Sequence, residues 1–288
     1  MFANVNGMKI YYEATGSGTP VLLIMGFGMS SNAWEPQVRE LEKRHRVIRF
    51  DNRGVARSGR VTTPYTLVDL ARDAVGVLDV EGIETAHIVG VSMGGMVAQE
   101  LALHFPARVR SLTLLATHPG GRGHRIPRAK ALALFLHANT STGTTRIKAL
   151  ARLLYPKKAR AHFENHPEQM AIAQELRDPI PRKTLVFQLG ALAIHDTRRR
   201  LKKLEGVPTL IARPREDILV RPSGSDLLHE AIPDSRMISF AGAGHGLTEQ
   251  CATELNGHLL AHFATADHSI ALASDPSKVT ELYPTEAA

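Results

Sequence analysis

A serine flanked by glycines stands where a predicted strand meets a predicted helix. The segment Gly90-Val91-Ser92-Met93-Gly94 follows the apolar run Ala86 to Val91 and opens the helical pattern Met93 to Phe105. A G-x-S-x-G sequence in this setting is typical of a sharp turn that exposes the serine at the carboxyl edge of a sheet. The alternative is a glycine-rich turn with an incidental serine. We expect Ser92 to be a nucleophile.

A serine hydroxyl needs a base to take its proton, and the base needs an acid to orient it. Of the 14 histidines, His245 lies in the glycine-rich loop Gly242 to Gly246, just after the last predicted strand. This position places it at the same sheet edge as Ser92. Asp217 follows the predicted strand Pro208 to Ala212 and is the expected acid, with the neighbouring Glu216 as the alternative.

Negative charge develops on the substrate oxygen during attack, so two backbone N–H donors are expected to bind it. Met93, directly after the nucleophile, supplies one, and Phe27 in the glycine-rich loop after Met25 supplies the other. A simple glycine turn is the alternative for that loop. Met25 and Gly26 are candidates to line the substrate pocket. His118 follows a core strand at the same edge, where either a pocket-lining role or a plain loop position is expected.

Alternating strand and helix patterns must position these residues. Continuous apolar runs indicate strands buried on both faces of a parallel sheet. Helical patterns separate them, which predicts an α/β fold with a mostly parallel central sheet flanked by helices. The predicted strands are Lys9 to Glu13, Pro20 to Met25, Arg46 to Phe50, Ala86 to Val91, Ser111 to Ala116, Pro208 to Ala212 and Ser235 to Phe240; the helices are Trp34 to Leu41, Leu67 to Leu78, Met93 to Phe105 and Cys251 to Phe263.

The alternation breaks at the turn Pro119 to Gly123 and resumes near residue 205. Between them the sequence predicts only helices, so we expect a helical cap over residues 119–204 inserted into a core of residues 1–118 and 205–263. The expected tail, 264–288, is polar, patternless and loose. The predicted cap helices are Arg128 to His137, Thr145 to Leu154, Glu168 to Leu176 and Lys183 to Ala193.

Composition excludes several classes of protein. The 288 residues are 43% hydrophobic and 22% charged, which is the balance of an ordinary globular protein. The single cysteine, Cys251, excludes an internal disulfide and a cysteine-based metal cage. The longest apolar stretch, Pro20 to Met29, is too short to span a membrane, and Met1 to Asn6 does not resemble a secretory signal. We therefore expect no transmembrane segment and a cytoplasmic location. Neither a dinucleotide-binding nor a P-loop motif is present, which argues against a nucleotide-dependent enzyme.

The positive charge is concentrated in the middle of the chain. Of 35 basic and 28 acidic residues, 18 and 6 lie between Pro119 and Gly206, which leaves 17 and 22 elsewhere. This distribution does not indicate a nucleic-acid-binding protein. Arg122, Arg125 and Arg128 follow the glycine hinge, where they could steer an anionic substrate; solvated helical faces are the simpler alternative.

Four motifs together resemble the α/β-hydrolase family over roughly Gly7 to Phe263. They are Met25-Gly26-Phe27-Gly28, Phe50-Asp51-Asn52-Arg53-Gly54, Val89 to Gly95, and Gly242-Ala243-Gly244-His245. The sequence is most similar to bacterial cofactor-free haloperoxidase-like esterases and enol-lactone hydrolases. It departs from the family at Met25, where histidine is usual, and at Ala56 and Pro214, where glycine is usual. The serine argues against epoxide hydrolases and haloalkane dehalogenases, which carry aspartate there.

The resemblance and the residues imply the same chemistry. We expect a serine hydrolase that cleaves a small carboxylic ester or lactone through an acyl-enzyme, with Ser92, His245 and Asp217 as the triad. No metal and no organic cofactor are expected. Peroxide could replace water as the acceptor, which would give a perhydrolase. The remaining alternative is a binding protein of this fold with little turnover.

Overall fold

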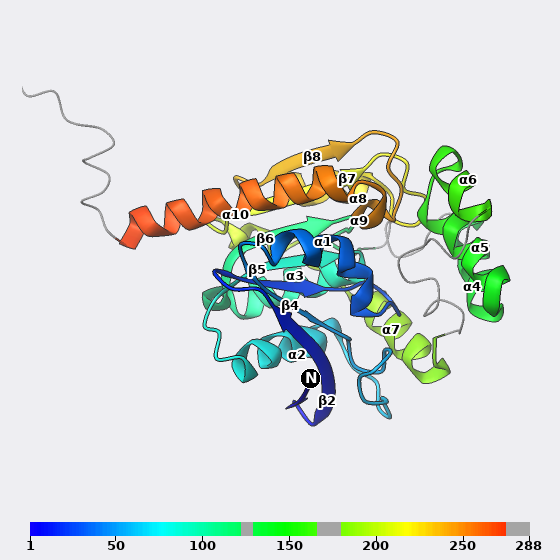
Figure 1. Ribbon diagram of the computed structural model, residues 1–288, viewed down its shortest axis with the longest axis horizontal. Coiled ribbons are helices and arrows are strands. Elements are labelled where there is room, and N and C mark those ends of the chain that lie inside the picture. Colours follow the sequence, from blue (N-terminus) through cyan, green and yellow to red (C-terminus); the bar gives the residue numbers. More distant parts are fainter. Residues whose placement is uncertain (122–128, 166–179, 275–288) are drawn as a thin grey trace, which may run out of the picture.

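A computed structural model describes residues 1–121, 129–165 and 180–274, and its centre is an eight-stranded sheet (Figure 1). The strand order is β1-β2-β4-β3-β5-β6-β7-β8, with β1 and β2 antiparallel to their neighbours and the rest parallel. This arrangement confirms the predicted mostly parallel sheet. The strands are Phe2–Val5 (β1), Met8–Thr15 (β2), Pro20–Ile24 (β3), Arg46–Phe50 (β4), Ala86–Val91 (β5), Val109–Leu115 (β6), Thr209–Pro214 (β7) and Arg236–Phe240 (β8).

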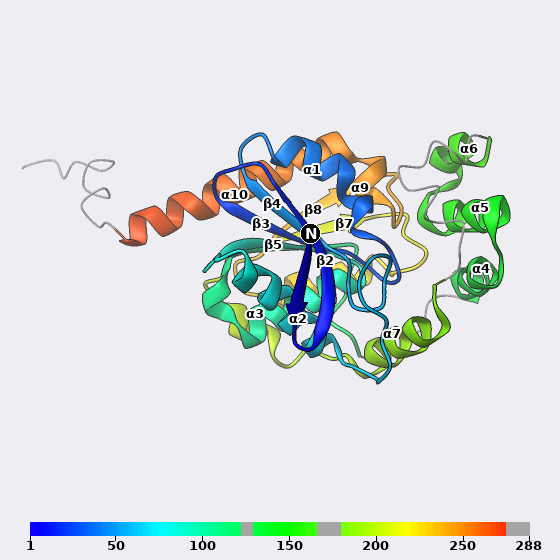
Figure 2. The ribbon, with the colours of Figure 1, turned by 60° about the horizontal axis from the view of Figure 1, so that its bottom comes forward.

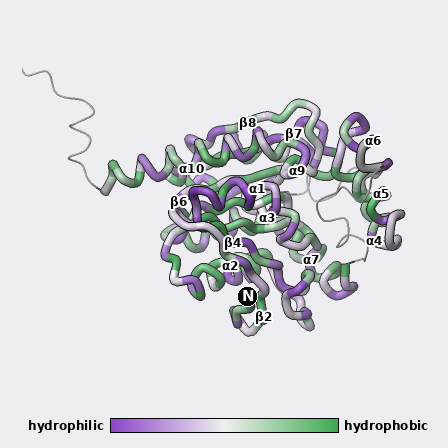
Figure 3. The backbone as a smooth tube through the Cα atoms, in the orientation of Figure 1, coloured by the Kyte–Doolittle hydropathy of each residue, from purple (hydrophilic) through white to green (hydrophobic). Residues whose placement is uncertain are grey.

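The central strands are mostly apolar because helices cover both of their faces. All six residues of β5 are buried, and so are the last four of β3. Figure 3 shows the resulting hydrophobic stretches in the middle of the molecule. The two strands are hydrogen-bonded neighbours, so their carboxyl ends, which precede Met25 and Ser92, lie next to each other at one edge.

Two layers of helices enclose the sheet. Figure 2 shows α1 and α10 on one side and α2 and α3 on the other. Two separate apolar clusters, one per face, fill the layers between sheet and helices. The elements on the first side are Glu35–Leu41 (α1), Leu247–Gln250 (α9) and Ala252–Ser274 (α10); those on the second are Leu67–Val80 (α2), Met93–His104 (α3) and Ser223–Ala231 (α8). Short 3-10 turns cover Ser31–Trp34, Pro106–Arg108 and Leu201–Leu204.

In the described residues, four further helices lie between β6 and β7 in the sequence and gather at one end of the molecule (Figure 1). They are Ala129–Thr140 (α4), Gly143–Leu154 (α5), Lys157–Asn165 (α6) and Arg182–Ile194 (α7). We call them the inserted helices. The structure has α4, α5 and α7 where helices are predicted, while the predicted helix over 168–176 lies outside the described residues. The sequence patterns did not predict α6, α8 or β1.

The two ends of the insertion lie side by side. An antiparallel bridge pairs Gly120 with Asp196, and the Thr197 N–H donates to the Pro119 C=O at 2.8 Å. A segment that leaves and rejoins the core at one point can be long without disturbing the sheet. None of the helices in the described ranges is long and apolar enough to cross a membrane.

The C-terminal helix contradicts the expectation of a loose tail from residue 264. Helix α10 continues to Ser274, and the turn that follows residue 263 still contacts the core. Ala266 is fully buried, and Asp267 accepts hydrogen bonds from Arg110 at 2.8 Å and from Thr19 at 3.0 Å. The remainder of the predicted tail, 275–288, lies outside the described residues.

Candidate active site

Ser92 occupies a strained turn between β5 and α3. Its φ of +57° and ψ of −122° lie outside the ordinary regions for a residue with a side chain. Hydrogen bonds to the neighbouring strand hold this conformation: the Ser92 N–H donates to the Leu115 C=O at 2.9 Å, and the Thr117 hydroxyl donates to the Ser92 C=O at 2.7 Å. The serine is therefore presented rigidly at the carboxyl edge of the sheet.

The two glycines that flank Ser92 are needed for space. A Cβ on Gly90 would lie 2.2 Å from the Gly94 carbonyl oxygen, and one on Gly94 would lie 2.1 Å from the Ile24 carbonyl oxygen. Both neighbours are backbone atoms, which cannot rotate out of the way. The spacing of the G-x-S-x-G motif thus follows from helix α3 starting directly against strands β3 and β5.

A carboxylate orients the predicted base. His245 Nδ1 lies 2.6 Å from Asp217 Oδ2, and both side chains are buried. The other carboxylate oxygen of Asp217 accepts from the N–H groups of Leu219 and Val220 at 2.8 and 2.9 Å. Because a carboxylate only accepts, Nδ1 carries the proton of the shared bond, which leaves Nε2 as the proton acceptor.

The proline that departs from the family pattern does not disturb the acid. Pro214 is the last residue of β7, paired with Phe240 of β8. The next N–H groups, of Arg215 and Glu216, donate to the carbonyls of Phe240 and Ala243 at 3.1 and 2.9 Å. These bonds turn the chain so that Glu216 is exposed and Asp217 is buried against His245.

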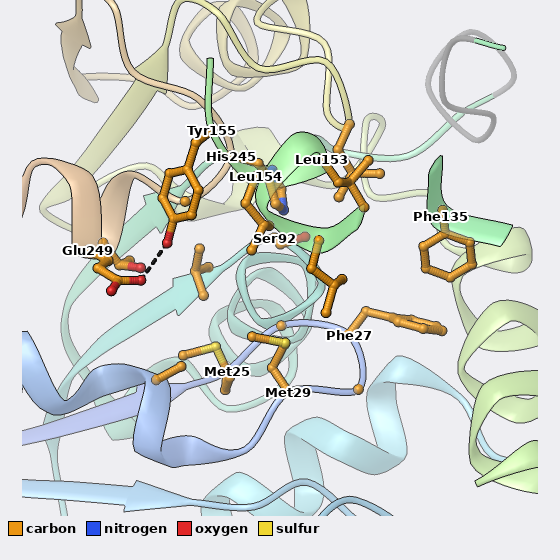
Figure 4. Close-up of a pocket in the computed structure, with 18 of the residues that line it drawn as sticks. Met25, Phe27, Met29, Ser92, Phe135, Leu153, Leu154, Tyr155, His245 and Glu249 are labelled. Carbon is orange, nitrogen blue, oxygen red and sulfur yellow. Dashed lines mark hydrogen bonds between the residues drawn. The ribbon is translucent and has the colours of Figure 1, made fainter. Parts of the chain in front are cut away.

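Ser92 and His245 line one pocket between the sheet edge and the inserted helices (Figure 4). Its cavity volume is about 120 Å³. Most of its wall is apolar and is formed by both the core and the insertion. The core contributes Met25, Phe27, Met29, Ala33, Val91 and Leu219; the insertion contributes Phe135, Leu150, Leu153, Leu154 and Ile180.

The pocket wall also holds a pair of polar side chains that the sequence analysis missed. The Tyr155 hydroxyl, just after α5, donates a hydrogen bond to Glu249 of α9 (Figure 4). Burial raises the pKa of Tyr155 well above its ordinary value, and the Glu249 charge adds to this effect, so the phenol stays protonated. The two residues are 94 positions apart, and no motif in the sequence links them.

Two backbone N–H groups near Ser92 are the predicted donors to a substrate oxygen. Met93 begins α3, where the first N–H groups of a helix have no acceptor within the helix. Phe27 lies in the loop after β3, and Gly26 of that loop packs on Ser92: a Cβ added to Gly26 would lie 3.2 Å from the Ser92 Cβ. In the described part of the chain, neither the Phe27 nor the Met93 N–H has a hydrogen-bond acceptor.

The three predicted pocket residues differ in outcome. Met25 and Gly26 line the pocket, whereas His118 does not. The His118 Nδ1 accepts from the Gly120 N–H at 2.9 Å, and Gly224 of α8 packs closely on its Cβ. Of the two alternatives for His118, the structure favours the plain loop position, because the chain turns away after β6 and places this residue against α8.

Among the described residues, no group of three or more His, Cys, Asp or Glu side chains could hold a metal ion. Arg122, Arg125 and Arg128, the candidates for steering an anionic substrate, lie outside the described residues.

Comparisons with known proteins agree with this fold. A family model described as alpha/beta hydrolase fold matches residues 19–250. The chain is 33% identical, over 90% of its length and 96% of the relative's, to a putative carbamate hydrolase, RutD, of Azorhizobium caulinodans. Two solved structures share its fold. One is Est816, described as an N-acyl homoserine lactone degrading enzyme (26% identity, 91% and 99% coverage, TM-score 0.77); the other is a bromoperoxidase from Bacillus anthracis (25% identity, 89% and 96% coverage, TM-score 0.78).

Proposed function

The chain belongs to the alpha/beta hydrolase family, and from this premise we propose that it is a serine hydrolase that cleaves a carboxylic ester or lactone through an acyl-enzyme. One observation carries the proposal. A serine in a strained turn and a histidine oriented by a buried carboxylate at 2.6 Å line the same pocket. This combination activates a serine toward a carbonyl carbon.

The proposed reaction has two halves. His245 Nε2 takes the Ser92 proton as the hydroxyl oxygen attacks the carbonyl, and then passes it to the leaving alcohol. Water then attacks the resulting ester of Ser92 while His245 Nε2 takes a proton from it; the bond between the acyl carbon and the serine oxygen breaks, His245 returns the proton to that oxygen, and the carboxylic acid leaves. Asp217 holds the imidazole and stabilises its protonated form. The N–H groups of Phe27 and Met93 bind the negatively charged oxygen in both tetrahedral intermediates.

The walls of the pocket favour a substrate with an apolar group next to the reacting carbonyl. Met25, Phe27 and Met29 face Phe135 and Leu153 across this space (Figure 4). Phe27 and Phe135 make an edge-to-face contact with ring centroids 5.4 Å apart. Burying an apolar acyl chain here contributes roughly 0.8 kcal/mol per methylene group. We therefore propose esters or lactones of apolar carboxylic acids, and residues 119–204 as a cap that forms the far wall. The cytoplasm remains the predicted location.

A carbamate is the second candidate substrate because the relative from Azorhizobium caulinodans carries that name. Attack by Ser92 on a carbamate would give a carbamoyl-enzyme with the same base and the same N–H donors. Carbamoyl-enzymes are resonance-stabilised and release their product more slowly than acyl-enzymes. A perhydrolase, as the bromoperoxidase likeness suggests, would use the same acyl-enzyme with hydrogen peroxide as the acceptor.

A fluorophosphonate probe with intact-mass and peptide analysis tests the mechanism. We expect one equivalent of label, on Ser92, and none in Ser92→Ala. The wild type is then assayed on p-nitrophenyl esters of increasing acyl length, on lactones, and on a p-nitrophenyl carbamate of matched size. Ser92→Ala should lose roughly 10⁴- to 10⁶-fold in kcat. Labelling of Ser92 without turnover of any ester, lactone or carbamate would favour the binding-protein alternative.

A further inference from the structure

One face of the inserted helix α7 is buried against the core. Thr184, Gln188 and Ala191, spaced four and three residues apart, lie on this face, whereas Val186 on another face is 61% exposed. Gln188 is 0% exposed. A buried amide has to be hydrogen-bonded to be stable, and Gln188 Oε1 accepts from the Gly28 N–H at 2.9 Å across 160 positions of sequence.

The loop that Gln188 contacts carries the Phe27 N–H and is held at both of its ends. At one end, Asn52 Nδ2 donates to the Met25 C=O at 3.0 Å. At the other, Gly28 has a φ of +61° and donates to Gln188. The Phe27 N–H lies between these two anchors and, among the described residues, has no acceptor of its own.

A second bond fixes α7 independently of Gln188. The Thr184 hydroxyl donates to the Gly54 C=O at 2.8 Å, in the loop that follows β4. Helix α7 thus contacts the loops after β3 and β4, at the carboxyl edge of the sheet. The two contacts are made by Gln188 and Thr184, which lie one helical turn apart. Removing the Gln188 acceptor leaves the Thr184 anchor in place, while the Phe27 loop loses this contact with α7.

We propose that Gln188 is a positioning residue for catalysis, which holds the Phe27 N–H in place through Gly28. The inference rests on the proposed function, in which this N–H binds the developing negative charge. An N–H donor is effective only within about 2.7–3.1 Å of that oxygen, and a misplacement of about 1 Å can cost as much as 100-fold in rate. The insertion would then contribute to rate as well as to the shape of the pocket.

Three variants of Gln188 separate the acceptor from the packing. Gln188→Met keeps the length and removes the acceptor, and Gln188→Asn keeps the amide on a side chain too short to reach Gly28. Gln188→Glu keeps an oxygen at the same distance. Thr184→Val is the matched control because it removes the other hydrogen bond of α7 without touching the Phe27 loop. Thermal unfolding reports the stability of all four proteins.

The readouts are kcat and KM on the p-nitrophenyl ester that the wild type hydrolyses fastest, and the affinity for an alkyl trifluoromethyl ketone. This ketone adds the serine oxygen to form a charged tetrahedral adduct, so its binding reports the oxyanion donors. The Met and Asn variants should lose roughly 10- to 100-fold in kcat. They should lose a similar factor in ketone affinity, with KM within about threefold of wild type. Gln188→Glu should recover most of both losses, and Thr184→Val should keep the wild-type values.

Two results would overturn the proposal while leaving the proposed function standing. One is wild-type kcat and ketone affinity in a folded Met or Asn variant; the other is a rise in KM alone. An equal loss of kcat in Thr184→Val would assign the effect to general loosening of α7 and would also overturn it. If either Met or Asn does not fold, the other decides. Failure of the proposed function is recognised separately, by absence of fluorophosphonate label on Ser92 of the wild type.

Discussion

Asp217 and His245 share a 2.6 Å contact between Oδ2 and Nδ1, although 28 positions separate them in the sequence. Each sits in a loop that follows one of two paired parallel strands, β7 and β8. Asp217 also accepts hydrogen bonds from two backbone N–H groups of its own loop. These bonds orient its carboxylate independently of the histidine. This relationship distinguishes Asp217 from Glu216, which is adjacent and exposed.

The first prediction is that Asp217→Asn lowers kcat by about 10³- to 10⁴-fold, because the amide no longer supports the required tautomer and the protonated imidazole. The matched control, Glu216→Gln, should stay within about tenfold of wild type. Steady-state ester hydrolysis at pH 7–8 measures both. If Glu216→Gln has the larger effect, the acid is Glu216 and the assignment of Asp217 has to be abandoned.

The second prediction concerns the acyl-chain selectivity of the pocket. Phe135→Ala should shift the preference toward longer p-nitrophenyl esters, since it removes the ring that faces Phe27. The ratio of kcat/KM between a long and a short ester should change by about tenfold or more. Leu136→Ala is the control, because Leu136 is adjacent, 56% exposed and not part of the pocket wall. The same shift in both variants would show that α4 acts on selectivity through its fold alone.

The third prediction is that Gly94→Ala abolishes activity and destabilises the protein. Its new Cβ would have to lie 2.1 Å from the Ile24 carbonyl oxygen, so α3 or β3 must move, and Ser92 would move with them. Gly257→Ala in α10 is the control. Nothing lies within 4 Å of a Cβ there, so it should be neutral or stabilise the helix by up to about 1 kcal/mol. Urea unfolding measures the stability of each variant, and fluorophosphonate labelling measures the reactivity of its Ser92. A folded, fully reactive Gly94→Ala protein would refute the steric account of the motif.

The fourth prediction compares two tyrosines that each donate to a glutamate. Tyr155→Phe should lower the free energy of unfolding by roughly 1–3 kcal/mol, because the bond to Glu249 is buried in the pocket wall. Tyr11 donates to Glu13 at 2.6 Å at a more exposed site, so Tyr11→Phe should cost less than about 1 kcal/mol. Urea unfolding measures both free energies. If the two variants lose the same free energy of unfolding, burial of the Tyr155 hydrogen bond has no energetic consequence.

The fifth prediction is a loss of stability in mild acid caused by buried histidines. Burial lowers the pKa of His87 to about 4, despite the nearby Asp267 carboxylate, and burial likewise lowers the pKa of His262 to about 4. Between about pH 6.5 and pH 4 the unfolded chain therefore binds more protons than the folded one. The free energy of unfolding should fall as the pH falls through this window.

Variants of these histidines check the fifth prediction. His87→Gln removes one titrating group, so its free energy of unfolding should depend less on pH between 6.5 and 4, by at most about 1.4 kcal/mol per pH unit. His262→Gln should show the same change, and pH 8 serves as the reference where both histidines are neutral. A pH dependence that is identical to wild type in both variants would contradict the assignment.

Local sequence was sufficient to single out the candidate nucleophile and its candidate partners. The Ser92 turn is recognisable because its strand, its two small neighbours and its helix are contiguous, and because the clash at Gly90 and Gly94 is with nearby backbone. Asp217 and His245 are predicted from their positions in loops that follow predicted strands, since parallel strands bring the loops after them to a common edge. The α/β architecture is predictable for a similar reason, because each apolar strand and each helical pattern is a continuous stretch of the sequence.

Only the tertiary structure decided how the insertion meets this edge. The contacts of Gln188 with Gly28 and of Tyr155 with Glu249 join helices to distant loops, and their side chains carry no periodic or motif signal. Likewise, α10 continues past residue 263 because Asp267 meets Arg110 on β6. A local pattern specifies backbone conformation, because neighbouring residues determine it. Contacts between distant segments depend on how whole elements pack, and the sequence of either element alone does not contain that information.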